Sequence, residues 1–454
     1  MSTFKFSVGS KKFHEAFQRY LMTTHSSKDD TIEAFVLFNS AEDLESFTSE
    51  YSPDNSIGNN DGSSHFGDKN NKVELFFSFS TLPCALLKAS IATCEKLAER
   101  TDVKMIDGDY PAFLSSLNIA AELEINEIHE SLLGPTGKNT TIAILDSGID
   151  HKMVNNSQFI KSFNLTDEED GDYCGHGTAL ASLLLGSDIN KHSNGRFHEQ
   201  IAGICPNAEI IDLKISDRSG RISSADIMMG LEFLKKQKVD IVLIGATTSV
   251  ATDGNDILSL FCREIAQQNK IIICPAGNFG PDPRTIGTPG CSNDVFTIGA
   301  IDERQRVAFF SSRGPTSDNH IKPDFVMHGA RVGVVFSDQH VLGSYKRDIA
   351  GPAPLSGTCI SATIFAGIIA LLKEIKKDAC AADIKNLIED ATISQFYTSY
   401  SEGNGFLDST RFLKKFDAVL KKPPKFSNLM RFSALLSMTF FTVFCLLSLV
   451  SFLL

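Results

Sequence analysis

Two apolar patterns alternate along the middle of the chain. Almost wholly apolar runs, typical of parallel strands buried on both faces, occur at residues 141–145, 209–214, 240–244, 270–274 and 295–298. Apolar positions at helical spacing predict helices between these runs at 178–185, 224–236 and 257–268. Strands that alternate with helices predict an α/β fold, in which helices flank a parallel sheet.

One longer apolar stretch, residues 355–372, has the period of a buried helix. It begins with Gly357 and Thr358 and carries a thiol at Cys359. The positive end of a helix dipole favours a thiolate, so this position suits a nucleophile. A buried cysteine that only starts a core helix is the alternative.

The first 110 residues have a different pattern. Residues 1 to about 30 are polar and show no period, and 52–72 are rich in Ser, Asn, Asp and Gly, which predicts a loop. We expect strands at 31–39, 73–80 and 103–106, and helices at 41–49 and 86–100. The chain should therefore divide into a small α+β domain (1–110), a linker (111–124), a main domain (125–413) and a basic linker (414–431).

The last segment, residues 432–454, contains no charged side chain. As a helix it would be about 34 Å long, enough to cross the hydrocarbon core of a bilayer. Basic residues precede it, and these favour the cytosolic side of a membrane. Because the N-terminus lacks the apolar core of a signal peptide, we expect a single-pass C-terminal tail anchor in the lipid bilayer, with the rest of the protein in the cytosol. A buried core helix is the alternative.

Composition narrows the function classes. The net charge of −12 over 454 residues argues against nucleic acid as the main partner. The ten cysteines include no Cys-x-x-Cys pair, which disfavours a zinc site and fits reduced thiols in the cytosol. An acidic run at 167–172 could select basic substrates or hold a structural calcium ion. A solvated loop is the favoured interpretation, because the ligand spacing of a calcium loop is absent.

Three short segments together indicate chemistry. Asp146 follows the apolar run 141–145, His176 lies between two glycines at the start of an apolar helix, and Cys359 starts another helix. An acid, a histidine and a nucleophile in this order can form a proton relay for nucleophilic catalysis. Each also has a plain structural explanation, as a helix cap or a core residue.

The segments around these residues resemble the signature blocks of the subtilisin-like peptidases. The blocks AILDSGID, CGHGTALASLL, CPAGNFG and SGTCISATIFAG occur in the family's order, and the resemblance covers about residues 125–413. It is strongest to the membrane-anchored site-one type. It implies a parallel sheet flanked by helices, hydrolysis of a polypeptide substrate bound in extended form, and no required cofactor. Residues 1–110 resemble the family's inhibitory propeptide, which implies an intramolecular inhibitor.

The resemblance also assigns roles to residues. It makes Asp146 the acid, His176 the base and Asn278 the side chain that donates to the oxyanion. Cys359 stands at the nucleophile position, where the family has Ser.

The strand that lines the specificity pocket departs from the family. The family usually has Ser-Leu-Gly in this strand, which pairs with the extended substrate, and this chain has Gly245, Ala246 and Thr247. The side chain of Thr247 would narrow the specificity pocket at a wall that is usually open.

Three functions follow from the sequence. The first is an endopeptidase with a cysteine nucleophile, and the second is an acyl-transferase or ligase whose thioester is taken by an amine. The third is an impaired peptidase that binds peptides or other proteins. Retention of Asp146, His176 and Asn278 favours an enzyme, whereas the changes at Thr247 and Cys359 favour the third.

Overall fold

The computed structural model describes residues 12–25, 27–51, 73–114, 135–156, 159–188, 200–337, 353–394, 397–408 and 411–412. The loop expected at 52–72, the linker residues 115–124 and the basic linker 414–431 lie outside these ranges, as does the predicted membrane segment 432–454. Residues 1–412 group as one unit.

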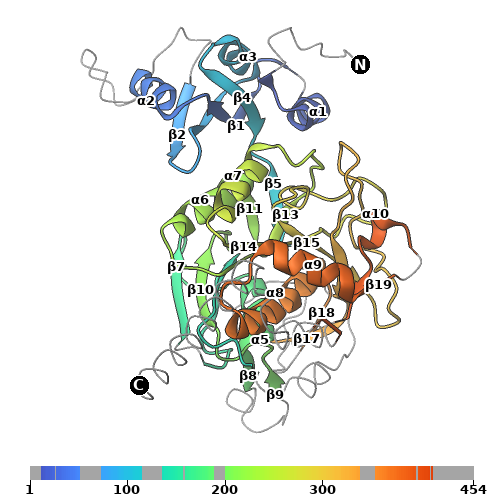
Figure 1. Cartoon of the computed structure of the whole chain (residues 1–454). Helices are drawn as coiled ribbons and strands as arrows, with labels where there is room; N and C mark the ends of the chain where they lie inside the picture. The colour runs from blue at the N-terminus through green and yellow to red at the C-terminus, as the bar shows by residue number, and fades with distance from the viewer. Residues whose placement is uncertain are drawn as a thin grey trace, which may run out of the picture. The chain divides into compact units, whose positions relative to one another are not determined.

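A nine-stranded sheet organises the main part of the chain (Figure 1). Its order is β19-β20-β16-β15-β14-β12-β6-β10-β7, and the pairs are parallel except β19 with β20. The strands are β6 (Thr141–Asp146), β7 (Ile160–Asn164), β10 (Glu209–Lys214), β12 (Ile241–Ile244), β14 (Ile271–Pro275), β15 (Phe296–Ile301), β16 (Phe325–His328), β19 (Thr392–Ile393) and β20 (Phe406–Leu407). All five predicted apolar strands are present, with shifts of a few residues at their ends. The expected parallel α/β sheet is confirmed.

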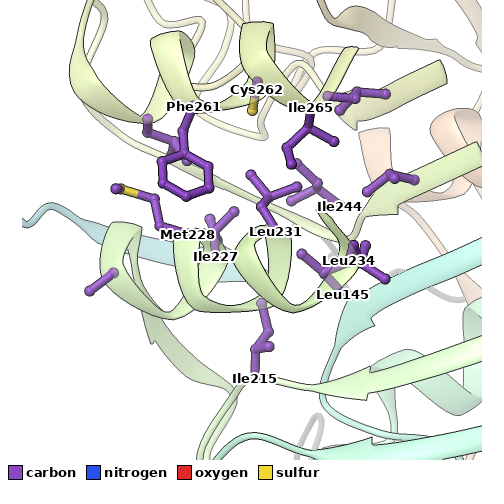
Figure 2. Packing of buried hydrophobic residues seen from close by; sticks show 14 of the residues in the cluster. Leu145, Ile215, Ile227, Met228, Leu231, Leu234, Ile244, Phe261, Cys262 and Ile265 are labelled. Carbon is purple, nitrogen blue, oxygen red and sulfur yellow. The ribbon is translucent and has the colours of Figure 1, made fainter. Parts of the chain in front are cut away.

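Helices α6 (Ser224–Lys235) and α7 (Ile257–Ala266) cover one face of this sheet. Figure 2 shows their apolar side chains packed over Leu145 of β6 and Ile244 of β12. Because these strands are buried on both faces, every residue of β12 and residues 142–145 of β6 are apolar, and the period-2 pattern of a half-exposed strand is absent.

The other helices of the main part are α5 (His176–Leu185), α8 (Thr358–Ile375), α9 (Ala381–Ala391) and α10 (Ser399–Glu402). Among the described residues, α8 is a helix that is long and apolar enough to cross a membrane, yet 89% of that segment is buried inside the protein. It is therefore the core helix of this unit, and it brings Cys359 into the interior.

The C-terminal end of α8 is tied to the segment that leads into β6. Glu374 accepts the backbone N–H groups of Thr136, Gly137 and Lys138 at 2.6, 2.6 and 3.0 Å. We expect Glu374→Ala to lower the free energy of unfolding by about 2–3 kcal/mol, because hydrogen bonds to a charged group are the stronger ones. Glu374→Gln keeps an acceptor and should lose less. Urea unfolding of both variants checks this, and equal losses would contradict a role for the charge.

The N-terminal region forms an antiparallel sheet with order β2-β3-β1-β4. Its elements are α1 (Glu15–Thr24), β1 (Thr31–Phe38), α2 (Ala41–Glu50), β2 (Val73–Phe79), β3 (Cys84–Ser90), α3 (Ile91–Glu99) and β4 (Val103–Gly108). The expected strands at 31–39, 73–80 and 103–106 and the helix at 41–49 are confirmed.

Two expectations for this region were wrong. The predicted helix 86–100 begins only at Ile91, because Cys84–Ser90 is a strand that pairs along its whole length with β1. The Ala and Leu residues of this segment favour a helix, but the segment pairs with β1 along one edge and with β2 along the other, and this pairing overrides the preference. Residues 1–30 also contain α1, which buries Ala16, Phe17 and Leu21.

Three short strands form a separate antiparallel sheet with order β11-β5-β13. They are β5 (Pro111–Leu114), β11 (Arg221–Ser223) and β13 (Ala246–Thr248). Residues 111–114, expected to belong to a linker, are thus the central strand of a sheet. Two further hairpin-like pairs are β8 (Gly186–Asp188) with β9 (Gln200–Ala202), and β17 (Val332–Val334) with β18 (Ala353–Leu355).

Candidate active site

Asp146, His176 and Cys359 meet in the interior of the main part. Asp146 ends β6, His176 is the first residue of α5, and Cys359 is the second residue of α8. The Nδ1 atom of His176 lies 2.9 and 2.8 Å from the two carboxylate oxygens of Asp146, and its Nε2 atom lies 3.2 Å from the Sγ of Cys359. All three side chains are 0% exposed. The fold therefore brings together the three residues that the sequence predicts to form a relay.

Glycines allow α5 to begin so close to β6. Gly175, the residue before the helix, has a φ of +90°, a conformation that side chains with a Cβ rarely adopt. A Cβ on Gly177 would collide with the carbonyl oxygen of Gly148, which follows Asp146 in the chain. The glycines on both sides of His176 thus permit the approach that joins it to Asp146.

The electrostatics of the three residues favour a protonated histidine. Burial works against the charged form of His176, but the charge of Asp146, the sulfur of Cys359 and their hydrogen bonds outweigh it, so its pKa is raised well above the usual range. Cys359 lies in the first turn of α8, where the helix dipole stabilises negative charge. The arrangement suits a thiolate–imidazolium pair.

Asn278 lies at the start of the same helix. Its Oδ1 atom accepts hydrogen bonds from the backbone N–H and the hydroxyl of Thr358, both at 3.0 Å. The Thr358 hydroxyl also accepts the backbone N–H of Gly277 at 3.1 Å. These bonds hold the Asn278 amide one residue from Cys359 and leave its Nδ2 atom as the donor. The role of Thr358 in this arrangement was not visible in the sequence.

Asp172, which the sequence predicts to lie in a solvated acidic loop, is instead a buried structural carboxylate of the site. It is buried, and it accepts hydrogen bonds from Ser147, from the backbone of Gly175 and from both the backbone and the hydroxyl of Thr178. Asp172 therefore links the residue after Asp146 to the start of α5. The remainder of the acidic run, 167–170, is exposed or half-buried. In the part of the chain that the structure describes, no cluster of His, Cys, Asp and Glu has the arrangement of a metal site.

The predicted substrate strand leads away from the acid of the relay. Gly245 lies against Asp146, since a Cβ on Gly245 would collide with the Asp146 carboxylate. The next residues form β13, where Ala246 and Thr247 pair with Leu114 and Phe113 of β5. Gly245 thus connects Asp146 to β13, and β5 lies along β13 in extended form; the place that β5 occupies between β11 and β13 is here called the groove.

Carboxylates join the N-terminal region to the helices of the main part. Asp107 and Asp109 accept backbone N–H groups in the first turns of α7 and α6 at 3.0 and 2.9 Å. Glu232 of α6 accepts the backbone N–H of Thr81 at 3.0 Å. Negative groups at helix N-termini are stabilised by the unpaired N–H groups and by the dipole. These bonds hold the N-terminal region against α6 and α7.

The stability of this interface should depend on pH through Asp107. Burial raises the pKa of Asp107 to about 6, although His14 and hydrogen bonds oppose the shift, and the value in an unfolded chain is about 3.9. The contribution of Asp107 to the free energy of unfolding is therefore complete below about pH 4, and it is lost as the pH rises through 6. Asp107→Asn should show a smaller fall in Tm between pH 4 and 6.5 than the native chain.

His14 does not disturb that measurement. Burial works against its charged form, but Asp253, Asp107 and Asp256 raise the pKa of His14 from 6.5 to about 9. The contribution of His14 to the free energy of unfolding is therefore constant below pH 6.5, and it falls only as the pH rises toward 9. Thermal unfolding at several pH values from 4 to 6.5 checks the expectation for Asp107, and parallel curves for the two proteins would contradict it.

Comparisons with known proteins agree with this fold. The model of the subtilase family, Peptidase S8, matches residues 137–410. The serine protease AprX of Bacillus subtilis is 28% identical over 279 residues, which cover 57% of this chain and 62% of AprX. The membrane-bound transcription factor site-1 protease of Rattus norvegicus is 26% identical over 290 residues, which cover 62% of this chain and 25% of that protein. The chain thus spans less than two thirds of the length of either relative.

One solved structure supports the same fold. Fervidolysin from Fervidobacterium pennivorans superimposes with a TM-score of 0.62 and 13% sequence identity, over 85% of this chain and 61% of that one.

Proposed function

This chain belongs to the subtilase family, and on that premise we propose that it is an endopeptidase whose nucleophile is the thiol of Cys359. The observation that carries the proposal is the contact of 3.2 Å between the sulfur of Cys359 and Nε2 of His176, whose Nδ1 is held by Asp146. A nucleophile, a base and an orienting group in hydrogen-bond reach are the requirements of covalent catalysis.

The reaction follows from these positions. The thiol proton of Cys359 moves to Nε2 of His176, which gives the thiolate–imidazolium pair, and the thiolate attacks the carbonyl carbon of the peptide bond. The electron pair of the carbonyl moves to its oxygen, which accepts a hydrogen bond from Nδ2 of Asn278. When the tetrahedral intermediate collapses, the amine leaves with the proton from His176 and a thioester remains on Cys359. Water, deprotonated by His176, then attacks the thioester carbonyl, and the carbon–sulfur bond breaks. The acid product leaves, and the sulfur of Cys359 takes the proton back from His176, whose imidazolium Asp146 stabilises.

We propose further that the N-terminal region, within residues 1–110, and β5 act as an intramolecular inhibitor. The support is the position of β5 between β11 and β13, where an extended substrate would pair with the groove edge. Phe113→Pro removes a backbone N–H from this central strand and should weaken the pairing. The variant is a way to open the groove in the full chain.

The test of the proposed function uses the full chain and its Phe113→Pro variant. Each is incubated with a peptide amide, with the matching peptide ester, and with the ester plus an added amine. Cleavage of the amide, lost on Cys359→Ala, supports the endopeptidase. Capture of the acyl group mainly by the amine supports an acyl-transferase or ligase, and no Cys359-dependent product from any substrate would leave only a peptide-binding function.

Attachment to a membrane is a separate proposal. It rests on the apolar composition of residues 432–454 and on the basic residues that precede them, and the similarity to site-one-type relatives is compatible with it. Protease protection of the intact chain in sealed membranes tests it. Digestion of the main part from the cytosolic side is the expected result, and protection of the main part would overturn the proposed orientation.

A further inference from the structure

The pairing of β5 with β13 shows how an extended chain runs along the groove. Leu114 opposes Ala246 and Phe113 opposes Thr247, so β5 runs toward Gly245 and the relay. A substrate in the same register, which the proposed function requires, places its next residue opposite Gly245, beside Asp146. In the proposed function, that residue is the one whose carbonyl carbon Cys359 attacks.

The direction of its side chain follows from strand geometry. Directly opposed residues of an antiparallel pair share a face of the sheet, and alternate residues along a strand share a face. The residue that precedes the scissile bond lies two positions after the one opposite Thr247. Its side chain therefore points to the face of the strand that carries the side chain of Thr247.

Three chain segments meet on that face. Gly277 is held next to the start of α8 by its hydrogen bond to Thr358. Gly287 lies against the carbonyl oxygen of Thr248, where a Cβ would collide with it. Thr247 projects from β13 toward both glycines. A side chain that entered beside Cys359 would have to occupy the space between these segments.

Thr247 fills this space. Its Cγ2 atom lies 3.2 Å from the position of a Cβ on Gly277, and its Oγ1 atom lies 2.8 Å from the position of a Cβ on Gly287. The same Oγ1 donates a hydrogen bond to the carbonyl oxygen of Thr288 at 3.1 Å, which fixes the rotamer. Thr247 is 0% exposed. The exposed ring of Phe279, with Cδ2 at 3.2 Å from the Gly277 position, narrows the entrance from another side.

We infer that the protein accepts substrates with a small residue, Gly, Ala or Ser, immediately before the scissile bond, because Thr247 occupies the space that a larger side chain needs. The inference rests on the proposed peptidase function and deepens it. The sequence itself has a residue of this size, Ser115, directly after the segment Ala112-Phe113-Leu114.

The experiment measures the alkylation rate of Cys359 by two peptide chloromethyl ketones, Ala-Phe-Leu-Ala and Ala-Phe-Leu-Phe. The sulfur displaces chloride, and mass spectrometry locates the new C–S bond. The full chain carries Phe113→Pro so that the probes reach the groove. We expect the Ala probe to react on the order of 100-fold faster than the Phe probe, since a closed pocket discriminates strongly by size.

Variants at Thr247 connect the preference to its cause. Thr247→Gly should bring the two alkylation rates within about tenfold of each other, because the Phe probe reacts faster. Thr247→Ser lacks only Cγ2, so its ratio of the two rates should lie between those of the native protein and Thr247→Gly. Thr248→Ser, on the other face of β13, serves as the matched control and should leave the ratio unchanged. Circular dichroism confirms that each variant is folded.

The outcomes separate the inference from the function on which it rests. Equal rates for the two probes in the native Thr247 background overturn the inference and leave the peptidase function standing. A ratio that persists in folded Thr247→Gly also overturns it. Absence of labelling at Cys359 by both probes, together with no cleavage of any peptide, overturns the function and the inference together.

Discussion

Replacement of Cys359 by alanine is expected to lower kcat/KM for peptide hydrolysis by a factor on the order of 10⁶. The reason is that His176 remains as the proton acceptor but no nucleophile lies within its reach, so no thioester forms. Residual turnover reflects only binding and the oxyanion donor. The measurement is hydrolysis of a peptide with a small residue before the scissile bond, in the Phe113→Pro background.

Two further variants control this experiment. Cys359→Ser keeps a nucleophilic atom with the same partners and should retain measurable hydrolysis. Cys380→Ala removes a half-buried thiol at the start of α9 and should leave the rate unchanged. Full activity in Cys359→Ala would show that the thiol is not the nucleophile.

Asp146→Asn is expected to lower kcat by about 10⁴-fold at neutral pH with little change in KM. Both carboxylate oxygens of Asp146 lie within hydrogen-bond distance of Nδ1 of His176. An asparagine at position 146 can present its amide N–H to Nδ1 of His176. The substitution also removes the carboxylate charge that stabilises the imidazolium. The imidazole then adopts the wrong tautomer for accepting the thiol proton at Nε2.

The same substitution has a second, independent consequence for pH dependence. Because the charge of Asp146 helps to raise the pKa of His176, Asp146→Asn should lower the pKa of the ring, which NMR of the imidazole measures. Asp167→Asn removes an exposed carboxylate from the loop before α5 and is the matched control. An unchanged His176 titration in Asp146→Asn would contradict the proposed charge interaction.

The N-terminal region shows the limits of local sequence patterns. The Ala, Leu and Lys residues within Cys84–Ser90 favour a helix, but the segment is a strand because it pairs with β1 along one edge and with β2 along the other. The helix boundary did carry a local signal, since Ser90 caps α3 by accepting the backbone N–H of Thr93. A Ser before a stretch with helical period is common in sequences. By itself it therefore does not locate the start of the helix when the strand partners are unknown.

By itself, the sequence determined the parts of this protein that depend on neighbours along the chain. Apolar runs predicted the strands of the main sheet, and the end of one run predicted the position of Asp146. His176 and Cys359 were predicted instead at the starts of apolar helices. These predictions hold because burial on both faces of a parallel sheet requires continuous apolar strands, and their ends lie at one edge.

Only the tertiary structure decided the features that depend on distant segments. The pairing of β5 with β11 and β13 joins residues that lie more than 100 positions apart in the sequence. The position of Thr247 between Gly277 and Gly287, the bond from Thr358 to Asn278 and the burial of Asp172 likewise rest on long-range contacts. A short strand or a single polar side chain has no period of its own. Its conformation is therefore selected by the hydrogen-bond partners and the space that the folded chain supplies.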